Sequence, residues 1–156
     1  MCNNTLLGQR LNLSSSSDIF DNLIKKNEWE TLIRLFSLNI LDINHRDCKG
    51  RNILYFAILN KKYEYIKILF DLRVNSRVNF SLNAINFAVC LDDIKSLEIL
   101  LKCGLSVDTL DEIGTSPLIY AILYNKKKST EFLIKSGADL ELEDFMGNCA
   151  KKMLLN

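Results

Sequence analysis

The stretch of sequence that decides the fold runs Asp111-Glu-Ile-Gly-Thr-Ser-Pro-Leu-Ile-Tyr-Ala121 and closes with Leu133-Ile-Lys-Ser-Gly-Ala-Asp139. Ser116 followed by Pro117 is typical of a helix start, because serine caps the first turn and proline fits the first helical position. Gly137 is typical of a helix end, because glycine tolerates the left-handed conformation that follows many helices. The stretch therefore predicts two short helices, over about residues 117–124 and 127–135.

The same pattern recurs along the chain. It begins again at Asp144, 33 residues after Asp111, and it is found 33 residues earlier, at Val78. A further unit opens at Asp47, and a degenerate first unit occupies residues 18–44. Two kinds of residue recur at fixed offsets: an apolar one (Leu54, Ile85, Leu118) and a small one (Ala57, Ala88, Ala121). Such repetition indicates helix pairs that must stack to bury their apolar faces.

A unit that reads Asp-x-x-Gly-x-Thr/Ser-Pro-Leu, then Ala, then Leu-Leu and Gly-Ala-Asp resembles an ankyrin repeat. The resemblance covers about residues 18–156, and the unit from Asp111 is nearest to the consensus. It implies an all-α ankyrin-repeat solenoid of helix pairs joined by β-hairpin-like loops. Two units depart from this pattern. In the unit from Val78, Val78 and Ser81 stand in place of the usual Asp and Gly, and Ala84 stands in place of the proline. In the unit from Asp47, Ile53 stands in place of the proline.

The repeats predict the domain organisation. We expect an N-terminal tail at 1–17 and a repeat domain at 18–156. Its units are expected at 18–46, 47–77, 78–110, 111–143 and 144–156, the first and last being caps with charged outer sides, as the water-exposed ends of a solenoid require. Leu6, Leu7, Leu11 and Leu13 of the tail could instead pack across the first repeat.

Composition excludes several classes of partner. The 20 Lys and Arg nearly balance the 19 Asp and Glu, so the net charge of +1 creates no field that attracts nucleic acid or an anionic membrane. No apolar run approaches the roughly 18 residues of a membrane span. The five cysteines are odd in number and form no Cys-x-x-Cys pair. We expect a soluble protein with reduced thiols in the cytoplasm, with the nucleus as the alternative compartment, and no nucleic-acid or membrane partner.

Catalytic motifs are missing from the sequence. His45 is the only histidine, and we interpret it as a solvent-exposed loop residue. There is no Gly-x-Gly-x-x-Gly, phosphate-binding Gly-Lys-Ser/Thr loop or His-Glu-x-x-His. Two acidic clusters, Asp92-Asp93 and the acidic residues within 141–144, lack the spacing of a calcium loop. We interpret the first as a solvated helix start and the second as a solvated hairpin. We expect no enzyme activity, no cofactor and no metal site.

Lysines gather at the expected turns between the two helices of a unit, at 25–26, 61–62 and 126–128, with Asp92-Asp93 interrupting the row. We favour a solvated edge over a site for phosphate or an acidic partner.

In proteins that resemble this family, the hairpin tips and the inner side of the first helix form a concave partner-binding face. Residues there that neither cap nor pack carry the information about the partner. The candidate partner-binding residues are Arg46, Lys49, Arg51, Arg77, Phe80, Leu82, Leu91, Ile113, Leu123, Tyr124, Phe145 and Met146. Leu59 and Leu110 accompany them. The face is basic at one end and apolar elsewhere, which favours a protein contact. The other interpretation is that hairpin tips fold down and bury some of these groups.

The sequence therefore predicts a non-catalytic protein–protein interaction module that binds an acidic and apolar segment of another protein. Self-association through the concave strip is also compatible with it. The alternative function is an inhibitor or decoy, similar to short viral or pathogen-encoded ankyrin proteins that block a host regulatory protein.

Overall fold

The computed structural model describes residues 16–155, and over that range the chain is helical, as predicted. The helices are α1 (Ser16–Lys25), α2 (Trp29–Ser37), α3 (Ile53–Leu59), α4 (Tyr63–Asp71), α5 (Ala84–Cys90), α6 (Ile94–Lys102), α7 (Pro117–Leu123), α8 (Lys127–Lys135) and α9 (Ala150–Leu155). Between residues 16 and 155 the only β-type pairing is one isolated antiparallel bridge, from Arg77 to Asn83.

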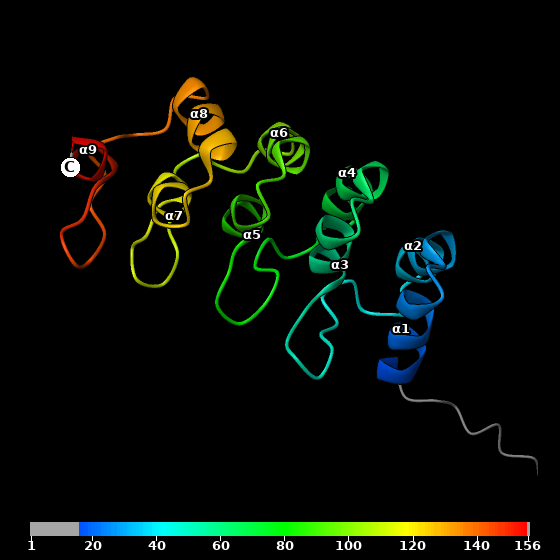
Figure 1. Cartoon of the computed structure of the whole chain (residues 1–156). Coiled ribbons are helices and arrows are strands. Elements are labelled where there is room, and N and C mark those ends of the chain that lie inside the picture. Colours follow the sequence, from blue (N-terminus) through cyan, green and yellow to red (C-terminus); the bar gives the residue numbers. More distant parts are fainter. Residues whose placement is uncertain (1–15, 156) are drawn as a thin grey trace, which may run out of the picture.

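The helices stack as pairs along one axis. Figure 1 shows α1, α3, α5, α7 and α9 in one row and α2, α4, α6 and α8 in a second row above it. The loops that precede α3, α5, α7 and α9 project to the same side, below the first row. The described residues therefore form a solenoid with a helical body and a row of projecting loops.

Capping side chains start the inner helices, as predicted for Ser116. The side chains of Asn52, Asn83 and Ser116 accept hydrogen bonds from the backbone N–H groups of the residues three positions later. Each cap satisfies a backbone donor that the first helical turn leaves without a partner. α3, α5 and α7 have only 7 residues each, too few to be stable alone, so packing between pairs must hold them.

The core runs through the whole stack. Ala57, Ala88 and Ala121 are 0% exposed, which fits their predicted place where helices approach closely. Aromatic rings join successive pairs: Tyr55 of α3 stacks on Phe87 of α5 with ring centroids 4.4 Å apart, and Trp29 of α2 stacks on Tyr65 of α4 at 5.6 Å. These contacts between neighbours fix the register of the repeats.

The turns between the two helices of a pair share one conformation. Asn27, Lys61, Asp92 and Asn125 occupy the left-handed region, with φ of 58°, 54°, 54° and 51°. Because the turns have the same conformation, counting from these residues identifies equivalent positions in different repeats.

All four projecting loops close in the same way. The N–H of the opening residue donates to the carbonyl of the residue four positions later, from Asp47 to Arg51, Val78 to Leu82, Asp111 to Thr115 and Asp144 to Asn148, at 2.9–3.2 Å. The carboxylate of the opening aspartate also accepts backbone N–H groups in three of the loops. In the Val78 loop, Asn79 Oδ1 accepts the N–H groups of Ser81 and Leu82. An asparagine one position later thus replaces the missing aspartate.

Three expectations need correction. His45 is half-buried and packs edge-on against Phe20, with ring centroids 5.1 Å apart, rather than lying free in solvent. Asp92 and Asp93 are half-buried and hydrogen-bonded, because they tie neighbouring repeats together. α1 begins at Ser16, two residues before the expected start. The predicted tail up to residue 15, with its four leucines, lies outside the described residues.

Candidate partner-binding surface

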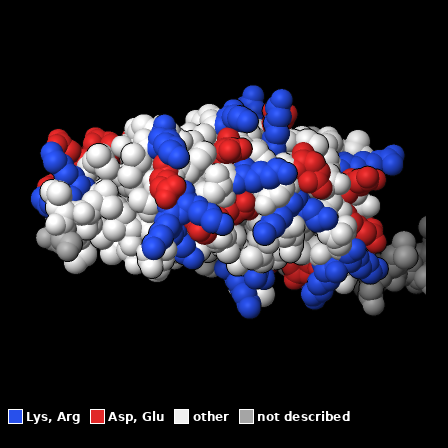
Figure 2. Space-filling model, turned by 45° about the horizontal axis from the view of Figure 1, so that its top comes forward, with Lys and Arg blue, Asp and Glu red and all other residues white. Residues whose placement is uncertain are grey.

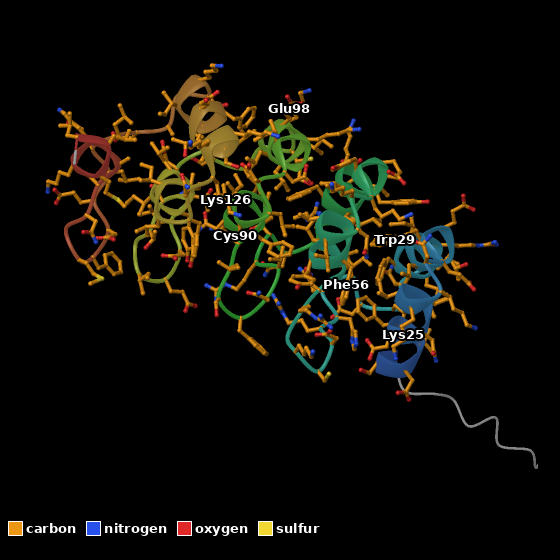
Figure 3. All side chains as sticks on the ribbon, in the orientation of Figure 1. Lys25, Trp29, Phe56, Cys90, Glu98 and Lys126 are labelled. Atoms are coloured by element: carbon orange, nitrogen blue, oxygen red, sulfur yellow. The ribbon has the colours of Figure 1, made fainter. Side chains whose placement is uncertain are left out.

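Two rows of residues follow the solenoid on the side of the projecting loops. The hairpin row contains the two tip residues of each loop: Cys48 and Lys49, Asn79 and Phe80, Glu112 and Ile113, Phe145 and Met146. The helix-end row contains the two residues that precede each left-handed turn: Lys25 and Lys26, Leu59 and Asn60, Cys90 and Leu91, Leu123 and Tyr124. We call the two rows together the inner strip. Figure 3 labels Lys25 and Cys90, which hold equivalent positions at the ends of α1 and α5.

The aromatic rings of the hairpin row are supported from one side and open on the other. Phe80 is 69% exposed, yet its ring lies so close to Gly50 of the preceding loop that a Cβ added there would be 2.2 Å away. Phe145 is 78% exposed and lies in the same way over Gly114, at 2.7 Å. Both glycines have positive φ. Each ring is thus held against the neighbouring loop while its outer face stays free for contact.

The helix-end row is apolar in the same repeats. Leu123 and Tyr124 are 61% and 57% exposed, and Leu91 is 41% exposed. Tyr124 stacks on Tyr120, whose hydroxyl donates to Asp111 Oδ2 at 2.8 Å. Burial and the contact with Asp111 raise the pKa of Tyr120. The hydroxyl therefore remains a donor, and it joins the helix-end row to the loop of its own repeat.

Most of the predicted basic residues are engaged in holding the loops. Arg51 Nε lies 2.7 Å from Asp47 Oδ2, Arg46 donates to the carbonyls of Gly50 and Arg77, and Arg77 pairs with Glu112 at 2.6 Å. Leu82, an apolar member of the predicted partner-binding set, is half-buried. Of the predicted basic residues only Lys49 is both exposed and without an ion pair among the described residues.

The hydrogen bond and charge of Asp47 raise the pKa of Arg51. Burial acts to raise the pKa of Asp47, but its hydrogen bonds from Arg51 and Lys49 outweigh burial and lower it. Both groups stay charged, so this pair stabilises the loop rather than offering a free cation to a ligand.

Sequence reasoning missed two features. The first concerns Lys25 and Lys26, which the sequence places at an exposed turn: they are exposed, and they also hold the positions equivalent to Leu123 and Tyr124. Aligning the repeats on their left-handed turns reveals this. The second feature is a contact between repeats: Asp92 Oδ1 accepts the N–H and the hydroxyl of Ser129, at 2.9 and 2.7 Å. No sequence signal connects those two residues.

The opposite side of the solenoid carries mixed charge. Figure 2, turned so that α2, α4, α6 and α8 come forward, shows basic and acidic side chains interspersed. A groove of about 670 Å³ between α4 and α6 is lined by Glu64, Lys67, Asp71 and Lys102, again of both signs. These features fit a solvated surface better than a site for one charged ligand.

Two cysteines of the described chain have pKa values that burial shifts. Cys90 and Lys126 lie close together (Figure 3), but burial raises the pKa of the Cys90 thiol more than the lysine lowers it. Burial also raises the pKa of Cys103. Between residues 16 and 155 no group of three or more His, Cys, Asp or Glu side chains could hold a metal ion. None of the described helices is long and apolar enough to cross a membrane.

Comparison with known proteins identifies the class of protein that this geometry defines. Residues 70–144 match the model of the family described as ankyrin repeats (3 copies), and the stacked helix pairs have the ankyrin-repeat fold. Ankyrin repeats form a non-catalytic module that generally mediates protein–protein interaction. The chain is also 28% identical over 127 residues to the potassium channel AKT2/3 of Arabidopsis thaliana. That match covers 77% of this chain and 16% of the channel.

Proposed function

We propose that the chain is a non-catalytic binding module whose partner, another protein, docks along the inner strip. The observation that carries this proposal is the exposure of apolar side chains along the inner strip in three successive repeats, at Phe80, Ile113, Tyr124 and Phe145. Exposed apolar patches rimmed by polar groups commonly mark protein contacts, and aromatic residues are enriched among those that dominate binding.

The rigid support of these rings favours the same function. Phe80 and Phe145 rest on the glycines of the preceding loops, and Tyr124 rests on Tyr120. Side chains that are already ordered lose little conformational entropy when a partner docks. The resemblance to part of a potassium channel supports the repeats alone.

We also infer that the chain acts in the cytoplasm, where its cysteines stay reduced. Cys48, Cys90, Cys103 and Cys149 form no disulfide within the described residues. Such free thiols are usual in reducing compartments.

We further infer the division into units at 18–46, 47–77, 78–110, 111–143 and 144–156, with the first and last as caps. Residues on the two outer faces of the stack of repeats support this division. Asn22 stands where the later repeats have Phe56, Phe87 and Tyr120, and Thr130 stands where the earlier ones have Leu32, Ile66 and Leu97. Polar residues at the two stacking faces favour solvent over another repeat.

Truncation tests this division. Deleting residues 145–156 removes α9, which packs against α7, and leaves Ala121 and Ile122 uncovered. We expect aggregation and a lower melting temperature. A truncated chain that is monomeric and as stable as the full chain would contradict the cap at 144–156.

The binding function is tested by affinity capture from the source cells, comparing the wild-type chain with a Phe80→Asp, Tyr124→Asp variant. The matched control is Thr31→Asp, Ser136→Asp, which adds the same charge at two exposed residues outside the inner strip. We expect the wild type and the control to capture the same partner and the strip variant to lose it. Equal capture by the strip variant, with unchanged circular dichroism, would show that the partner binds elsewhere.

A further inference from the structure

The inner strip changes character along its length. In the first two repeats its exposed charged members are Lys25, Lys26 and Lys49. None of these lysines has an ion-pair partner among the described residues. In the later repeats the equivalent positions are held by the exposed apolar residues Phe80, Leu91, Ile113, Leu123, Tyr124 and Met146, and Phe145 lies beside Met146. The strip is therefore basic at one end and apolar at the other.

The acidic groups in the loops of the inner strip are already paired. Asp47, in the loop beside Lys49, is 6% exposed and is paired with Arg51. Glu112 is the acidic member of the hairpin row, and it pairs with Arg77 at 2.6 Å. The three lysines therefore remain the unpaired charges of the strip, and they belong to the first two repeats, which are adjacent in the stack.

From this distribution we propose that the partner segment is acidic at one end and apolar over the rest, and that it lies with its acidic end on repeats one and two. The proposal rests on the binding function proposed above and adds the chemistry and the direction of the partner. Charge complementarity at an interface fixes register and suppresses partners of the wrong sign. The apolar residues of the strip contribute most of the binding energy, and the lysines set the direction in which the partner segment lies.

The dimensions set the length of the partner segment. Packed helices lie roughly 8–10 Å apart, so the three steps from α1 to α7 span about 25–30 Å. A helical segment needs about 20 residues to cover that length, because it rises 1.5 Å per residue. An extended segment needs about 8 or 9.

The test uses fluorescent synthetic peptides of about 20 residues. The first has a run of glutamates followed by a segment of leucine, phenylalanine and serine. The second has lysine in place of every glutamate, and the third has serine in place of every leucine and phenylalanine. Binding is measured by fluorescence anisotropy at low and at physiological salt.

Two charge-reversal variants are compared. The strip variant is Lys25→Glu, Lys26→Glu, Lys49→Glu. The matched control is Lys127→Glu, Lys128→Glu, Lys135→Glu, which makes the same change of net charge on exposed residues of α8. We expect the wild type and the control to bind the glutamate peptide at least about tenfold more tightly than the lysine peptide, and the strip variant to reverse that preference. The serine peptide should bind to none of them.

A photo-crosslinker at the charged end of the glutamate peptide tests the direction. It should label residues 25–61 and leave 110–146 unlabelled.

The outcomes separate this proposal from the one on which it rests. If the glutamate and lysine peptides bind the wild type equally, and Phe80→Asp, Tyr124→Asp abolishes both, the strip binds protein segments but the charge proposal is wrong. If that double variant leaves peptide binding unchanged, the peptides do not bind at the inner strip, and the proposed binding surface is wrong. A concentration-dependent dimer in sedimentation velocity, abolished by the same double variant, would make a second copy the occupant and overturn the proposal.

Discussion

At the scale of single residues, Asn86 occupies the least favourable environment in the described chain. It is 0% exposed, and neither its side-chain oxygen nor its nitrogen has a hydrogen-bond partner. The equivalent positions in the neighbouring repeats hold Tyr55 and Ile119. A buried polar group without a partner has lost its hydration without compensation, and this typically costs about 1–3 kcal/mol.

We therefore expect Asn86→Leu to raise the free energy of unfolding by about 1–3 kcal/mol in urea denaturation. The contrasting variant is Asn52→Leu. Asn52 is also 0% exposed, but it caps α3 and donates to the carbonyls of Asn75 and Arg77. Its replacement should lower stability. If Asn86→Leu destabilises as much as Asn52→Leu, Asn86 makes bonds that this account does not include.

The lowered pKa of Asp47 predicts that the stability of the fold depends on pH. Although burial opposes it, the hydrogen bonds from Arg51 and Lys49 lower the pKa of Asp47 below its ordinary value of 3.8. A group whose pKa is lower in the folded state stabilises the fold above its ordinary pKa, and that contribution is lost as the pH falls through the folded-state value. Asp47→Asn should therefore be less stable than wild type at neutral pH, and its unfolding free energy should change less below pH 3.8.

Thermal denaturation over a pH series measures this effect. The control is Asp71→Asn, an exposed residue of α4, which should keep the pH dependence of the wild type. If Asp47→Asn keeps it as well, the loop pair does not contribute to acid sensitivity.

At the scale of helices, the sequence predicts starts better than it predicts contacts between repeats. Ser116 with Pro117 predicted the start of α7, because a cap is a local hydrogen bond, and Asn52 and Asn83 cap α3 and α5 in the same way. The start of α8 is different. Its N-cap residue Lys126 makes no side-chain cap bond, and Asp92 of the preceding repeat accepts the N–H of Ser129 in its place. That contact depends on stacking, which no local pattern encodes.

We expect Asp92→Gly to destabilise the protein by about 1 kcal/mol, the usual effect of losing a helix cap. Glycine tolerates the positive φ at this turn, so the variant removes the carboxylate without straining the backbone. Asn125→Gly is the matched control, because Asn125 has the same conformation, with φ of 51°, one repeat later. It should be neutral or stabilising in urea denaturation. Equal effects of the two substitutions would show that the bond to Ser129 contributes nothing measurable.

At the scale of the whole molecule, the repeat period predicted the solenoid, because each offset fixes the face on which a residue lies. Exposure of Phe80, Ile113 and Phe145 followed from the same offsets. The basic residues were harder to assign. Whether Arg46 and Arg51 face solvent or hold a loop depends on side-chain hydrogen bonds within and between loops. Because the first repeat departs from the sequence pattern of the others, the positions equivalent to Lys25 and Lys26 in later repeats could not be identified from the sequence.

The central claim is that a partner protein binds through the apolar part of the inner strip. Its most direct test is calorimetric titration of the partner captured from cells against two sets of variants: single alanine substitutions of Phe80, Tyr124 and Phe145, and the triple variant Lys126→Ala, Lys127→Ala, Lys128→Ala. We predict that each aromatic substitution weakens binding by about 2 kcal/mol or more, because buried aromatic anchors dominate interfaces. The lysine variant should change mainly the salt dependence. Loss of the partner in the lysine variant, with binding kept by all three aromatic variants, would contradict the claim.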